Sequence, residues 1–169
     1  HLNRILREEG FLTARKEIGG WETLDYGASR AFAVADHQLA HVYVPRPQDV
    51  PSVAERLQRV DGVDRVLDRQ AQAEFGIDHE RSGELVVVSD RESWFTYYFW
   101  QDDNLAPDFA RTVDIHRKPG YDPVELFVDP KLAFPKLKIA RRLAQKLLGF
   151  RYYMDVIGLD AQIVRGSHG

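Results

Sequence analysis

The chain has 169 residues, of which 44% are hydrophobic and 29% charged, and its formal net charge is −3 at pH 7. It contains no cysteine, which excludes a disulfide scaffold, a thiolate zinc site and a cysteine nucleophile. The weakly acidic balance gives no reason to expect a nucleic-acid polymer or a membrane as partner, and no apolar run reaches the roughly 18 residues of a membrane span. We therefore expect one cytoplasmic domain, or a fragment of one.

Short apolar runs separated by glycine and proline fill the first half of the chain. They predict, in order, a helix over residues 2–9, a strand over 11–16, a strand pair over 31–35 and 41–44 joined by a tight connection, a helix over 52–59, a strand around 63–67, a short helix near 70–75 and a strand over 84–89. This order indicates an α+β fold, with a small mixed sheet and helices packed on it.

The second half is less regular. Residues 94–100 form a dense aromatic run, and residues 102–130 are rich in turn-forming residues, which is typical of a functional or packed irregular loop. Residues 136–148 form the clearest helix, because Leu137, Ala140, Leu143, Ala144 and Leu147 make one apolar stripe and Gly149 follows at the C-cap. Residues 132–134 and 160–164 are weaker strand candidates.

Asp36, His37 and His41 place three potential metal ligands within six residues. On one continuous strand the two histidines would stand about 13 Å apart, too far to share an ion. A tight turn would let them converge, and the flanking apolar runs favour a hairpin. The alternative interpretation is a turn aspartate beside two half-exposed histidines. His1 and His79 are expected to be solvated.

A second polar cluster lies between Thr112 and Pro123. Arg117 and Lys118 are suited to a phosphate or carboxylate, with His116 and Tyr121 beside them. The equally weighted alternative is a structural loop, in which Asp114 and Asp122 bind backbone amides and Arg117 pairs with one of them. Trp94 begins the aromatic run, which favours core over a pocket for a flat group.

The chain closes on Gly166-Ser167-His168-Gly169, a histidine among small residues. The preceding Arg165 makes an Arg-Gly-Ser-His run that also occurs in purification tags. Gln162, Ile163 and Val164 before it have the character of a native strand, which favours a native histidine. His168 is therefore a candidate metal ligand.

Several stretches together resemble one family. They are the segment Leu2-Asn3-Arg4-Ile5-Leu6-Arg7-Glu8-Glu9-Gly10-Phe11-Leu12, the runs Ser29-Arg30-Ala31-Phe32-Ala33 and His41-Val42-Tyr43-Val44, the segment Arg81-Ser82-Gly83-Glu84-Leu85, and the closing Gly-Ser-His-Gly. Their order is similar to the C-terminal half of a type I phosphodiesterase/nucleotide pyrophosphatase of the alkaline phosphatase superfamily.

The resemblance implies a metal-dependent phosphoryl-transfer enzyme that usually holds two zinc ions, which polarise the phosphoryl oxygens and lower the pKa of the nucleophile. It makes His168 the last metal ligand and the long segment before it a cap that selects the substrate. The family's Ser-Asp-His-Gly motif and its Thr or Ser nucleophile have no match in this sequence, so the resemblance does not carry the metal role to Asp36, His37 and His41.

We accordingly expect a strand-rich opening segment (residues 1–45), a cap region (46–150) and a return toward a metal-site core (151–169). The chain would be the cap or insertion domain of an α/β hydrolytic core, with a small phosphoester and the remainder of the catalytic domain as partners. Alone it would be inactive and bind no metal tightly, because one ligand cannot hold two ions. The alternatives are a self-contained ligand- or metal-binding module without catalysis and, less favoured, a single-metal hydrolase that uses Asp36, His37, His41 and His116.

Overall fold

The computed structural model describes residues 1–114 and 116–166. The helices are α1 (Leu2–Glu8), α2 (Val50–Gln58), α3 (Arg69–Glu74) and α4 (Pro135–Leu147), and the strands are β1 (Ala14–Lys16), β2 (Glu22–Leu24), β3 (Phe32–Asp36), β4 (Leu39–Tyr43), β5 (Val63–Leu67) and β6 (Leu85–Ser89). Four short 3₁₀ helices complete the described part: η1 (Pro47–Asp49), η2 (Asp103–Leu105), η3 (Pro123–Leu126) and η4 (Ala161–Ile163).

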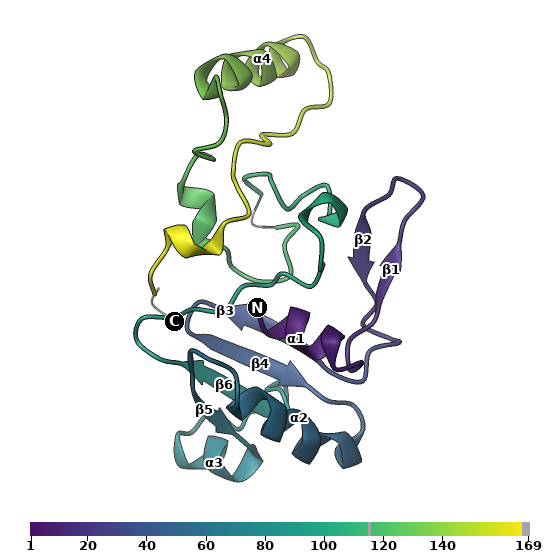
Figure 1. Cartoon of the computed structure of the whole chain (residues 1–169), viewed down its shortest axis with the longest axis vertical. Helices are drawn as coiled ribbons and strands as arrows, with labels where there is room; N and C mark the ends of the chain where they lie inside the picture. The colour runs from purple at the N-terminus through teal and green to yellow at the C-terminus, as the bar shows by residue number, and fades with distance from the viewer. Residues whose placement is uncertain (115, 167–169) are drawn as a thin grey trace.

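The main sheet has the strand order β3-β4-β6-β5, and β1 and β2 form a separate two-stranded ribbon (Figure 1). Neighbouring strands of both sheets run antiparallel. The main sheet is therefore antiparallel, whereas the sequence predicted a mixed sheet. The predicted α+β class is confirmed. The hairpin of β3 and β4 is also confirmed, and its turn places His37 at a φ of 56°, a left-handed conformation that a tight hairpin turn often requires.

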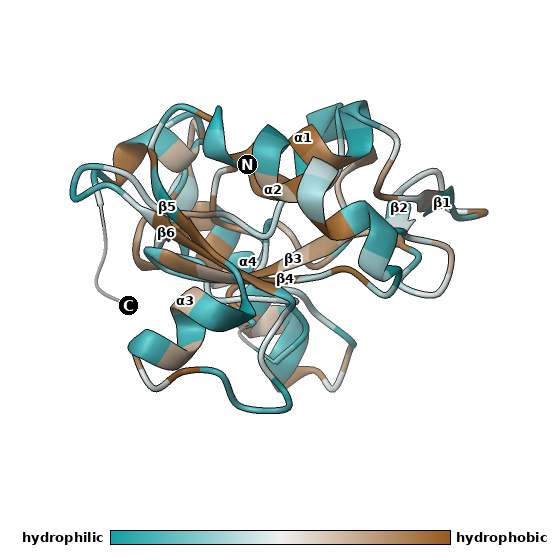
Figure 2. Cartoon of the chain, turned by 90° about the horizontal axis from the view of Figure 1, so that it is seen from below, coloured by the Kyte–Doolittle hydropathy of each residue, from teal (hydrophilic) through white to brown (hydrophobic). Residues whose placement is uncertain are grey.

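Helices α1 and α2 cover one face of the main sheet, and α3 lies on the opposite side (Figure 2). Alternate residues of β4 point to the covered face, so Ala40 and Val42 are buried there. Leu6 and Leu57 of the two helices belong to the same core cluster. The inward-facing residues of β4 therefore pack with both helices in one core.

The buried side chain of Asn3 joins α1 to β3, a strand at the edge of the main sheet. Its side-chain amide accepts a hydrogen bond from the Ala33 amide (2.7 Å) and donates one to the Ala33 carbonyl (2.9 Å). A buried polar group needs such partners. Helix α1 is thereby tied directly to strand β3.

The aromatic run is core, as the sequence favoured. Phe95, Tyr97, Tyr98, Phe99 and Trp100 are all buried. The run lies outside the helices and strands named above. Its position is therefore held by the packing of its buried rings. It carries the chain from the sheet into the irregular region beyond.

The two weak strand predictions in the second half were wrong. Residues 132–134 form no strand, and the tail contains η4 instead. The Asp160 carboxylate accepts a hydrogen bond from the Gln162 amide (3.0 Å) and so initiates this turn. Local side-chain capping therefore prevailed over the apolar pattern.

Helix α4 forms where predicted, but it has no buried residue. It stands apart from the main sheet at the far end of the molecule (Figure 1). Arg142 holds it to the following segment by two hydrogen bonds to the Asp155 carboxylate (2.8 and 3.0 Å), and Lys138 pairs with the same carboxylate at 3.2 Å. No described helix is long and apolar enough to cross a membrane.

Candidate functional site

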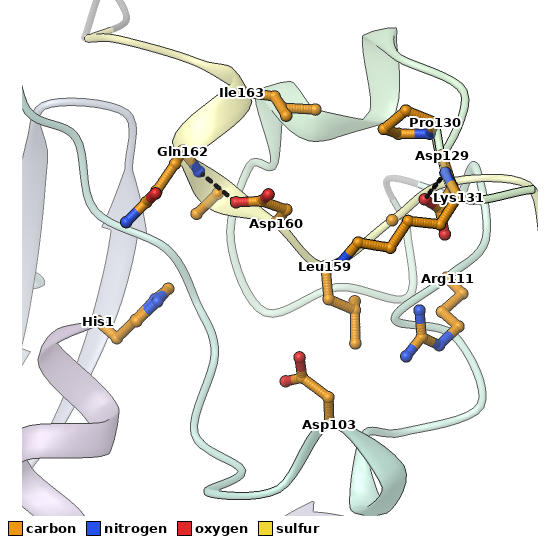
Figure 3. Close-up of a pocket in the computed structure, with 12 residues that line it drawn as sticks. His1, Asp103, Arg111, Asp129, Pro130, Lys131, Leu159, Asp160, Gln162 and Ile163 are labelled. Atoms are coloured by element: carbon orange, nitrogen blue, oxygen red, sulfur yellow. Dashed lines mark hydrogen bonds between the residues drawn. The ribbon is translucent and has the colours of Figure 1, made fainter.

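A pocket of about 350 Å³ lies where the first residue meets segments from the second half of the chain (Figure 3). The beginning of η2, the irregular loop, the segment before α4 and the turn at η4 all contribute to its wall. Its charged and polar lining residues are His1, Asp103, Arg111, Asp129, Lys131, Asp160 and Gln162. Residues far apart in sequence thus meet in one depression.

The carboxylates of this pocket are held by local partners. Asp103 accepts hydrogen bonds from Arg4 (2.8 Å) and from the Trp100 indole (3.0 Å). Asp129 binds the Lys131 amide, and Asp160 caps η4 as described above. These contacts orient the acidic groups without help from the pocket's own cations.

Arg111 and Lys131 are the cations of the pocket, and neither forms an ion pair with another residue that the structure describes. Both side chains lie at the pocket in the close-up view (Figure 3). A guanidinium can bind two oxygens of a phosphate or carboxylate, and an ammonium adds a compact point charge. The pocket can therefore receive an anionic group beside carboxylates that accept hydrogen bonds from hydroxyls.

His1 forms one wall of this pocket. Its ring nitrogen Nδ1 lies 2.6 Å from the Thr96 hydroxyl, and the ring stacks on Tyr98 with a centroid distance of 5.4 Å. The sequence predicted a solvated His1, and the residue is exposed but fixed by these contacts. His79 is exposed as predicted.

The structure does not bring Asp36, His37 and His41 together as a metal site. His37 is buried in the hairpin turn and stacks on Tyr121 with a centroid distance of 4.4 Å, whereas Asp36 is exposed. His41 lies on β4, and its Nδ1 accepts a hydrogen bond from the Gly83 amide (3.2 Å). Among the described residues no group of three or more His, Cys, Asp or Glu side chains can hold a metal ion.

His41 gives the fold a specific pH dependence. Burial lowers the pKa of His41 below its ordinary value of 6.5, and nearby Arg69 lowers it further against the opposing effect of Asp36. The unfolded chain therefore takes up a proton at a higher pH than the folded chain, so stability falls as the pH drops through about 6.5 toward the folded pKa. Urea unfolding at about pH 7.5 and about pH 5.5 should show this loss, reduced in His41→Gln and unchanged in His79→Gln. Equal pH slopes for the wild type and His41→Gln would contradict it.

The second predicted cluster is divided between surface and core. Arg117 pairs with Asp108 (2.8 and 3.1 Å), not with Asp114 or Asp122, and its guanidinium lies over the Phe109 and Tyr153 rings. His116 and Tyr121 are exposed. Trp94 is half-buried and donates its indole N–H to the Val164 carbonyl (3.1 Å).

Lys118 is fully buried, so a substrate cannot reach it in this structure. Its ammonium lies 2.6 Å from Glu125 and 3.5 Å from Asp122. Burial raises the pKa of Asp122, although Lys118 and the Val124 amide both act against the shift. Burial, reinforced by Asp122, also raises the pKa values of Tyr97 and Tyr98. The predicted anion-binding lysine is thus the centre of a structural ion cluster.

Sequence reasoning missed the pocket residues Arg111, Lys131, Asp103 and Asp160. The irregular region was recognised as a functional or packed loop, but no spacing rule connects residues 103, 111, 131 and 160. The turn-initiating character of Asp160 was the only local signal. The predicted metal ligand His168 lies outside the described residues.

A sequence model of the family described as type I phosphodiesterase / nucleotide pyrophosphatase matches residues 1–122. No curated protein matches the chain at a significant level. A similar solved structure is phosphonoacetate hydrolase from Sinorhizobium meliloti 1021 in complex with phosphonoacetate, with 24% sequence identity and a TM-score of 0.38. That match covers 56% of this chain and 22% of the hydrolase chain.

Proposed function

Because the chain belongs to the type I phosphodiesterase / nucleotide pyrophosphatase family, we propose that it is the part of a metal-dependent phosphoester hydrolase that covers the active site and selects the substrate. The phosphoester would bind in the pocket of Figure 3. The family match supports the hydrolase class, and the pocket supports the role within it.

The proposal rests on the two pocket cations, which form no ion pair with a described residue although carboxylates line the same pocket. Arg111 and Lys131 come from segments 20 residues apart, line the same depression and have no ion-pair partner among the described residues. A phosphodiester carries one negative charge and two unesterified oxygens, which suits a guanidinium with a neighbouring ammonium. Asp103 and Asp160 at the same pocket would accept hydrogen bonds from hydroxyls of the esterified group.

The family's divalent metal enters the proposal through His168 alone. The described residues contain no group of three or more side chains that could hold a metal ion. His168 would supply one ligand by its motif, and the remaining ligands and the nucleophile would come from the remainder of the catalytic domain. A metal site needs three or four protein ligands, so the 169-residue chain is inert in this proposal.

Inertness is tested by hydrolysis of bis(4-nitrophenyl) phosphate with added zinc. We expect the 169-residue chain to give no turnover above that of zinc alone, because the remaining ligands and the nucleophile would come from the remainder of the catalytic domain. Release of nitrophenolate is followed by absorbance, with a His168→Ala variant in parallel. Turnover by the chain that is lost in His168→Ala would contradict inertness.

The anion pocket is tested separately by binding. We expect the same phosphodiester to shift the amide NMR signals around Arg111 and Lys131 with a dissociation constant in the millimolar range, about −4 kcal/mol. Arg111→Gln should weaken binding about tenfold, as loss of one charge-assisted contact implies. Arg91→Gln is the matched control, because Arg91 is exposed and lies outside this pocket. Equal affinity in both variants would remove the support that the pocket gives.

A further inference from the structure

Helix α4 presents an apolar surface that nothing in the described chain covers. Leu137, Leu147 and Leu148 are 69, 88 and 73% exposed. Phe134 before the helix and Phe150 after it are 74 and 65% exposed. Exposed apolar residues gathered in this way mark an interaction surface.

The orientation of α4 is set by its opposite side. Lys138 and Arg142 lie one turn apart and both pair with Asp155, which fixes that side to the chain. Leu137 and Leu147 belong to the stripe predicted from the sequence, and at 100° per residue this stripe lies away from the side that Asp155 holds. The apolar face is therefore turned outward.

The charge around this face differs from that of the whole chain. Residues 131–151 contain seven of the 23 Lys and Arg residues and none of the 26 Asp and Glu residues. Three of these cations, Lys136, Arg141 and Lys146, form no ion pair with a described residue. The overall charge of −3 conceals this strongly basic segment, which is why composition predicted no membrane partner.

We propose that α4 binds an anionic lipid surface, lying in the plane of the headgroups with its apolar face inserted. An outward apolar face, cations along the helix that form no ion pair with a described residue, and aromatic residues at both ends are the properties of an interfacial helix. Its 13 residues span about 20 Å. The separation of α4 from the main sheet (Figure 1) lets the helix reach a surface while the acidic body stays clear of it. This inference does not depend on the hydrolase function.

A second copy of the chain is one competing occupant, and the properties of the surface distinguish it from lipid. A dimer seam between helices needs only a narrow stripe of apolar residues and does not require a cationic border. The apolar surface extends past the end of α4 to Leu148 and Phe150, and Lys136, Arg141 and Lys146 form no ion pair with a described residue. The breadth of the face and its charge both favour lipid.

Cosedimentation of the 169-residue chain with vesicles tests the proposal. We expect binding to phosphatidylcholine vesicles that contain about 30 mol% phosphatidylserine, and little binding without the anionic lipid. The variant Lys136→Gln/Arg141→Gln/Lys146→Gln should lower the partition coefficient about 100-fold, since each cation near the surface contributes about fivefold. Leu137→Glu/Leu147→Glu should abolish binding. None of these side chains is buried, so circular dichroism should show the wild-type fold.

The control removes three cations from the body of the protein. Arg59→Gln/Arg65→Gln/Arg91→Gln makes the same change in net charge at exposed positions and should bind vesicles as the wild type does. Equal weakening by both triple variants would overturn the assignment to α4. A dimer in sedimentation velocity that Leu137→Glu/Leu147→Glu dissociates, without vesicle binding by the wild type, would overturn the lipid proposal in favour of a second copy.

Discussion

Replacing Lys118 by methionine is expected to destabilise the protein by about 3–5 kcal/mol, the usual cost of breaking a buried ion pair from one side. The Lys118 ammonium is fully buried between Glu125 and Asp122. Methionine fills a similar volume but leaves two carboxylates in a low-dielectric site without their counter-charge. The loss is measured as the decrease in the free energy of unfolding in urea.

Two variants identify the cause. Lys136→Met removes an exposed lysine from α4 and should change stability by less than about 0.5 kcal/mol. Lys118→Met/Asp122→Asn/Glu125→Gln removes all three charges and should recover much of the lost stability, because the penalty comes from the unpaired charges. If the triple variant is no more stable than Lys118→Met, the ion cluster does not explain the loss.

This test also separates the two interpretations of the loop that contains Lys118. The sequence placed Arg117 and Lys118 side by side and weighed anion binding equally against a structural role. Arg117 and Lys118 lie in an irregular turn, and the structure sends Lys118 inward and Arg117 to the surface. The same dipeptide thus divides between core and surface, which composition alone cannot show.

Regular elements were predicted where a local pattern sufficed. Helices α1, α2, α3 and α4 and the strands of the main sheet form close to their predicted positions, because periodicity and glycine breaks are local signals. Strand β2 was missed since its three residues, Glu22-Thr23-Leu24, are too few to show alternation. The strand predicted over residues 160–164 was wrong for the opposite reason. There the Asp160 carboxylate caps η4 and prevails over the apolar run.

The site was less accessible to sequence reasoning than the fold. Arg111 and Lys131 line the same pocket only because the irregular segments that carry them come together in the folded chain. The predicted site residues have other partners: His37 stacks on Tyr121, and Trp94 binds the tail. The clustering of functional residue types in the sequence did not reveal these side-chain partners, because they follow from tertiary packing.

The second large effect is expected at Trp100, whose replacement by alanine should cost about 3–5 kcal/mol, as for other large buried side chains. Trp100 is fully buried, stacks on Tyr98 with a centroid distance of 4.6 Å and meets Tyr97 edge-on at 5.7 Å. A stacking platform for a ligand would be exposed, and its truncation would cost little stability. Trp94→Ala is the comparison within the same run, and its half-buried ring should cost clearly less.

Trp100→Phe then separates packing from hydrogen bonding. Phenylalanine keeps an aromatic ring in the core but cannot donate to Asp103, which the Trp100 indole binds at 3.0 Å at the wall of the pocket. We expect a smaller loss than for alanine, about 1–2 kcal/mol, together with NMR shifts at Asp103 and neighbouring pocket residues. Shifts confined to the core, with no change at Asp103, would contradict this link. If the shifts reach Asp103, the indole connects the rigid aromatic core to a carboxylate of the proposed substrate pocket. The segment that stabilises the fold then also orients the site.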